Sequence, residues 1–80
     1  MITPDEAEAL ARKHMQDYVA ACGCNTVEDV GNALLKLASV TGLGIVATQG
    51  QEVAVAMIQG VARHLQKPQF SKRWTMGTVN

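Results

Sequence analysis

Small and apolar residues dominate the chain from Leu37 to Ala62. Between Leu37 and Arg63 there is one charge, Glu52, and the six residues from Val53 to Ile58 are all apolar. A solvated helix on a small monomer has one apolar stripe and one polar face. Six consecutive apolar residues cover every side of a helix, so this segment must be buried on more than one side. A chain of 80 residues is too short to bury such a helix on several sides with its own side chains. The pattern predicts self-association or a large partner.

The first predicted helix spans about residues 4–22. Thr3 is the expected cap, Pro4 takes the first helical position, and the acids that follow suit the positive end of the helix dipole. Apolar residues then recur at helical spacing. Gly23 supplies a left-handed stop at the C-terminal end.

The second predicted helix spans about residues 26–42. Thr26 is its expected cap, and the apolar positions that follow step in alternating threes and fours, as in a packing seam: Val27, Val30, Leu34 and Leu37. The Gly42-Leu43-Gly44 segment is expected to end this helix and to let the chain reverse.

The third predicted helix spans about residues 49–66, with Thr48 as its cap, and it stops before Pro68. A competing interpretation of residues 45–47 extends this helix backwards or makes them a short extended piece. The predicted fold is all-α: a hairpin of the second and third helices with the first packed on it. Residues 1–67 form the helical domain, and residues 68–80 form an irregular tail with basic and aromatic side chains.

Charge is balanced overall but divided along the chain. The net charge is zero, with −3 in residues 1–40 and +3 in residues 41–80. Helix-dipole complementarity explains much of this division. This division of charge would also permit head-to-tail pairing of two copies, or the binding of an anionic partner at the basic end. A neutral chain also has little repulsion to keep its copies apart.

The N-terminal residues lack the basic region and apolar core of a signal peptide, which predicts a cytoplasmic protein. A membrane span needs roughly 20 apolar residues. The uncharged stretches of this chain are shorter than that and are interrupted by polar side chains. We therefore expect no membrane partner.

No motif in the sequence predicts catalysis, a metal or a cofactor. Cys22 and Cys24 supply at most half of a zinc site, and His14 and His64 lie on or beside apolar helical stripes, where a hydrogen-bonded boundary role is typical. The glycines lack the lysine and spacing of a phosphate-binding loop. The chain is predicted to be neither an enzyme nor a cofactor protein.

Two sets of residues are the predicted sites. The oligomer interface is expected at Val53, Val55, Met57 and Ile58. The site for a partner or an anion is expected at Arg63, Lys67, Lys72, Arg73 and Trp74. Cations beside an exposed tryptophan are typical of binding hot spots and of anionic ligand sites. The third helix begins with Gln, Gly and Glu rather than with bases, so nucleic acid remains open as a partner but is not favoured.

Two functions follow from these patterns. The first is a small, oligomeric, non-enzymatic interaction protein that binds and modulates or inhibits another macromolecule. The alternative is an oligomer that binds or sequesters an anionic small molecule, such as a nucleotide, between its subunits. In general character, as a short helical chain without catalytic motifs, the protein resembles the small accessory proteins of phages and mobile elements.

Overall fold

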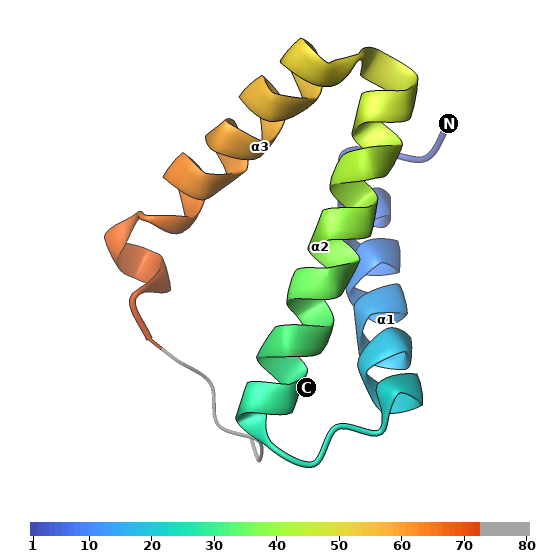
Figure 1. Cartoon of the computed structure of the whole chain (residues 1–80), viewed down its shortest axis with the longest axis vertical. Helices are drawn as coiled ribbons and strands as arrows, with labels where there is room; N and C mark the ends of the chain where they lie inside the picture. The colour runs from blue at the N-terminus through green and yellow to red at the C-terminus, as the bar shows by residue number, and fades with distance from the viewer. Residues whose placement is uncertain (73–80) are drawn as a thin grey trace. The chain divides into compact units, whose positions relative to one another are not determined.

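The chain forms three α-helices and a short 3-10 turn. The computed structural model describes residues 1–72, with α1 at Pro4–Cys22, α2 at Val27–Gln49, α3 at Gln51–Leu65 and η1 at Pro68–Phe70 (Figure 1). Residues 1–72 contain no strand. The all-α prediction with three helices is therefore confirmed. The described residues divide into two compact units, one from Met1 to Leu35 and one that begins at Lys36. The predicted domain division at residue 67 stays a prediction.

Local hydrogen bonds define both ends of α1 where the sequence predicted them. The Thr3 backbone N–H donates to Glu6 Oε1 at 3.0 Å, and the Glu6 N–H donates to Thr3 Oγ1 at 3.2 Å. This reciprocal capping box satisfies two amides at the helix start. At the other end, Gly23 has a left-handed φ of 67° and its N–H donates to the Ala20 carbonyl.

The first unit joins α1 to the beginning of α2. Thr26 caps α2, since its Oγ1 accepts a hydrogen bond of 3.0 Å from the Asp29 N–H, while Asp29 Oδ2 accepts one from the Asn25 N–H. The Tyr18 hydroxyl on α1 donates to the Ala33 carbonyl on α2 at 2.9 Å. Val30 is the one buried hydrophobic side chain that this unit contains.

Helix α2 is longer than predicted. It runs through Gly42 and Gly44 to Gln49, and neither glycine has a positive φ. Glycine weakens a helix interior but does not end it unless the backbone turns left-handed. The residues after Gly44 continue the helical spacing of apolar positions. The competing interpretation of residues 45–47 is also wrong, because they belong to α2.

The turn between α2 and α3 is made by Gly50 alone. Its φ of 90° and ψ of 160° lie in a region that is essentially restricted to glycine. Its N–H donates to the Val46 carbonyl at 2.9 Å, and its carbonyl accepts from the Ala54 N–H at 3.0 Å. Gly50 therefore closes one helix and opens the next. The predicted cap, Thr48, is wrong: it lies inside α2, where its hydroxyl donates to the Gly44 carbonyl at 3.0 Å.

The caps predict different responses at two threonines. Thr26→Ala should lower the free energy of unfolding by about 1 kcal/mol, because the Asp29 N–H loses its acceptor. Thr48→Ala should leave it unchanged or raise it slightly, because alanine is the better residue in a helix interior. Urea denaturation followed by circular dichroism measures both. Equal losses in the two variants would contradict these helix boundaries.

The turn predicts opposite effects at two glycines. Gly50→Ala should lower the free energy of unfolding by about 1–3 kcal/mol, because an L-residue is strained at that backbone conformation. Gly44→Ala is the matched control, since its new Cβ would meet no atom within 4 Å. It should raise the free energy of unfolding by about 0.5–1 kcal/mol. A neutral Gly50→Ala would show that the turn has a different geometry.

Candidate functional site

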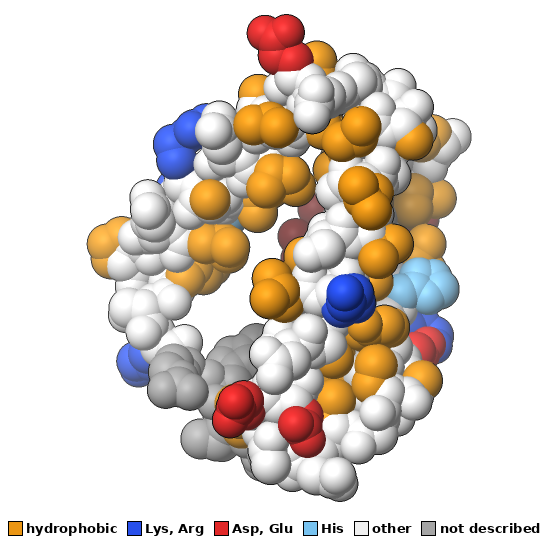
Figure 2. Space-filling view, viewed as in Figure 1, with side chains coloured by type: hydrophobic (Ala, Val, Ile, Leu, Met, Phe, Trp, Pro, Cys, Tyr) orange, Lys and Arg blue, Asp and Glu red, His pale blue; other side chains and the backbone are white. Residues whose placement is uncertain are grey.

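The second unit carries large apolar side chains that are exposed in the described part of the chain. Ala54, at 3% exposure, is the one hydrophobic side chain that this unit buries within the described residues. Its larger neighbours are open to solvent, including Leu43 at 68% and Val55 at 51%. Figure 2 shows such hydrophobic side chains gathered along α3. We call this set the α2–α3 apolar surface; it comprises Val40, Leu43, Val46, Val53, Val55, Met57, Ile58, Val61 and Leu65.

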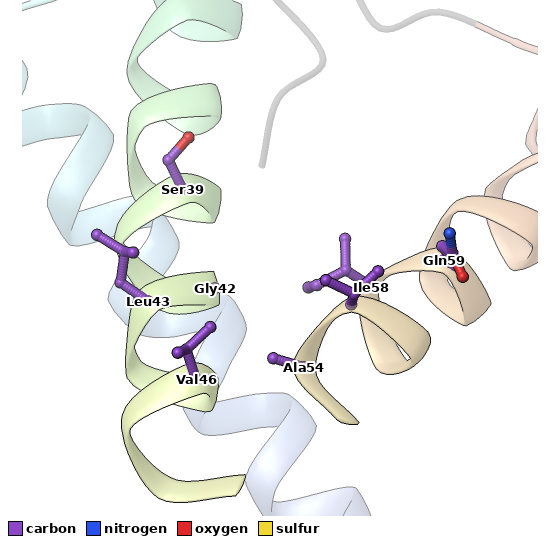
Figure 3. A pocket seen from close by; sticks show the side chains of 8 residues that line it. Ser39, Gly42, Leu43, Val46, Ala54, Ile58 and Gln59 are labelled. Atoms are coloured by element: carbon purple, nitrogen blue, oxygen red, sulfur yellow. The ribbon is translucent and has the colours of Figure 1, made fainter. Parts of the chain in front are cut away.

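An open cavity of about 280 Å³ lies within this surface, between the C-terminal half of α2 and the first half of α3 (Figure 3). Ala54 points from α3 toward α2, and Ile58 lies one turn further along α3. The cavity has no charged lining residue, and its polar side chains are those of Ser39 and Gln59. Apolar groups fit such a lining. It is formed by Ser39, Gly42, Leu43, Val46, Ala54, Val55, Ile58 and Gln59.

The predicted interface residues all lie exposed on α3. Val55 and Ile58 line the cavity, whereas Val53 and Met57 do not. The exposed fractions of the four range from 44% to 51%. The structure thus brings half of the predicted interface to the cavity.

Sequence reasoning missed the α2 side of this cavity. Ser39, Gly42, Leu43 and Val46 form it, but the prediction ended the helix at residue 42. Their spacing of three, one and three residues is that of one helix face. That periodicity was the signal in the sequence that the helix continues beyond residue 42 in spite of Gly42 and Gly44.

The predicted cationic site is partly described. Arg63 lies in the last turn of α3, and Lys67 precedes the η1 turn. Both are exposed, as is Lys72. None of the three lines the cavity. Arg73 and Trp74 lie outside the described residues.

The η1 turn brings an aromatic side chain back to the end of α3. The rings of Phe70 and His64 lie 5.0 Å apart at a tilt of 57°. This distance is within the range of favourable aromatic pairs. The contact places the Phe70 ring against His64 in the last turn of α3.

Two cysteines lie at the C-terminal end of α1 and in the loop that follows it. Cys22 and Cys24 are free thiols, and partial burial, followed by the nearby Cys22 and Asp29, raises the pKa of Cys24. Burial, followed by a hydrogen bond with Cys22, likewise raises the pKa of Tyr18. A raised thiol pKa disfavours the nucleophilic thiolate. Within residues 1–72, no group of three His, Cys, Asp or Glu residues is placed to hold a metal ion.

By length and composition, α2 could cross a membrane, and very little of it is buried. Its 23 residues exceed the length that the sequence prediction assumed. Core helices of soluble proteins meet the same criteria, so this property alone assigns no location. The cytoplasmic location stays a prediction.

Comparisons of the chain with protein-family models, with curated proteins and with solved structures found no match.

Proposed function

We propose that the protein is a non-enzymatic helical interaction protein that associates with itself and binds another macromolecule, which it modulates or inhibits. The observation that carries this proposal is the exposed and uncharged α2–α3 apolar surface. Burial of a valine, leucine or isoleucine side chain contributes about 1.5–3 kcal/mol. The chain obtains little of this stabilisation by itself, because among the described hydrophobic residues only Val30 and Ala54 are buried.

Exposed apolar side chains of this size support a protein–protein interface. The central charge of α2, Lys36, favours a soluble assembly over a membrane. It is exposed near the middle of the helix. A lysine at the centre of a bilayer costs about 2.5–3.5 kcal/mol on insertion scales. We therefore propose a cytoplasmic oligomer.

The alternative, an oligomer that holds an anionic small molecule between subunits, has less support. It requires cations to converge on a cleft. The cavity contains none, and Arg63, Lys67 and Lys72 lie outside its lining. Saturable binding of a nucleotide to the assembled protein, lost in Arg63→Glu, would favour this alternative.

Self-association has a direct test in Val55→Glu. A carboxylate buried without a partner is strongly disfavoured, so this variant should dissociate the oligomer. Gln16→Glu, at an exposed position on α1, makes the same change of charge and should leave the assembly intact. Multi-angle light scattering after size-exclusion chromatography measures the mass of each. A wild-type chain that is monomeric at micromolar and higher concentrations would refute self-association.

Binding of the second macromolecule is assigned to the basic C-terminal segment. Lys72→Glu with Arg73→Glu should abolish co-purification of the partner after cross-linking in cells, because it reverses the charge of the segment. Trp74→Ala should weaken binding by about 2 kcal/mol, the loss typical of a hot-spot residue. The matched control, Lys72→Arg with Arg73→Lys, keeps the charge and should keep the partner. Deletion of residues 72–80 without loss of binding would contradict this assignment.

A further inference from the structure

Two thiols lie on either side of one left-handed glycine in the connection between α1 and α2 (Figure 1). Cys22 is the last residue of α1 and is exposed, whereas Cys24 is half-buried. Gly23 between them has a φ of 67° and a ψ of 38°. All three residues belong to the first compact unit. The proposed function makes no use of them.

The conformation of Gly23 brings the two cysteines together. A left-handed helical residue mirrors a right-handed one, so the Cα atoms of its neighbours are about 5.4 Å apart, as for residues two positions apart in an α-helix. Disulfides join Cα atoms that are roughly 4.4–6.8 Å apart. An extended residue would place the same two atoms about 6.6 Å apart, close to the upper limit. The backbone thus meets the distance that a disulfide between Cys22 and Cys24 requires.

The two thiols are also near enough to act on each other. Partial burial, followed by the charges of Cys22 and Asp29, raises the pKa of Cys24. After burial, both cysteines contribute to the raised pKa of Tyr18. A thiolate at Cys22 influences these groups because it lies close to them. Oxidation to a disulfide would remove the repulsion between two neighbouring thiolates.

We infer that Cys22 and Cys24 form a reversible disulfide by exchange with a small disulfide such as oxidised glutathione. The exposed Cys22, as its thiolate, attacks one sulfur of that disulfide, whose S–S bond breaks and releases one glutathione. Cys24, as its thiolate, then attacks the Cys22 sulfur and releases the second glutathione. The two cysteines lose two protons and two electrons, and the small disulfide gains them as two thiols. This site goes beyond the proposed interaction function and does not rest on it.

The position of the pair makes this disulfide labile rather than structural. The stabilisation that a crosslink gives to a fold grows with the length of chain that it closes, and this crosslink encloses Gly23 alone. Exposed disulfides are also the ones that thiols reduce readily. In the cytoplasm, the location that we predict, disulfides are usually transient, catalytic or redox-sensing. The connection between α1 and α2 is therefore a redox-sensitive site.

Equilibration with glutathione tests the disulfide. The full chain is incubated without air at defined ratios of reduced to oxidised glutathione and then quenched with acid. It should lose both free thiols together and become lighter by two hydrogens in intact-mass spectrometry, and excess reduced glutathione should restore both thiols. Two free thiols at every ratio would overturn the inference. Stable glutathione adducts on both cysteines, or a disulfide-linked dimer in non-reducing electrophoresis, would overturn it as well.

Serine substitutions test the order of the two steps. Cys24→Ser blocks the second step, so a mixed disulfide of Cys22 with glutathione should accumulate. Cys22→Ser leaves the half-buried Cys24, whose raised pKa disfavours the thiolate, and its adduct should form about tenfold more slowly. Mass spectrometry of quenched samples follows both reactions. Faster modification of Cys22→Ser than of Cys24→Ser would contradict the assignment of Cys22 as the attacking thiol.

Substitutions of Gly23 test the geometry. A Cβ at this position would meet no atom within 4 Å, so the effect of a substitution comes from the backbone conformation. Gly23→Asn is the matched control, since asparagine tolerates the left-handed conformation, and it should change the equilibrium constant for the disulfide about twofold or less. Gly23→Val should lower that constant about tenfold, because a β-branched residue disfavours this conformation. Circular dichroism of the reduced variants checks that the helices are retained. Equal constants in the two variants would show that the left-handed turn does not join the cysteines, and would overturn the inference.

Discussion

The shortage of buried apolar area is the constraint on which the rest of the structure depends. In the described residues, the helices bury Val30 and Ala54 but leave valines, leucines and isoleucines open on α2 and α3. Conformational entropy opposes folding by roughly 1–2 kcal/mol for each ordered residue, and burial of apolar surface is its main compensation. The self-association that we propose would bury part of this exposed apolar area.

Gly50 determines where that apolar surface is divided. Gly50, in a backbone conformation that is essentially restricted to glycine, is the one residue between α2 and α3, so no loop separates the two helices. The unit thereby places the last turns of α2 and the first turns of α3 around one cavity. The position of the cavity is thus a consequence of one backbone position.

In the part of the chain that the structure describes, charged side chains do not line the cavity. Cys24 and Tyr18 have raised pKa values because they are partly buried, which favours their neutral forms. The cations of the C-terminal part of α3 stand apart from the cavity. A macromolecule can be recognised by exposed cations that are spread over a broad surface. A site for a small anion requires the cations to converge on one cleft.

The sequence alone determined the features that depend on neighbours along the chain. The capping box of Thr3 and Glu6, the left-handed Gly23 and the cap at Thr26 were all predictable, because each involves residues within a few positions of one another. The excess of apolar residues from Val53 to Ile58 was equally visible. The course of α2 through Gly42 and Gly44 was visible in the sequence only as the helical spacing of apolar positions around them, and the tertiary structure decided it. It likewise decided that Gly50 rather than Thr48 begins α3, and that Val55 and Ile58 share a cavity with Leu43 and Val46. Those outcomes depend on which surfaces meet across the turn, and local propensity does not specify that.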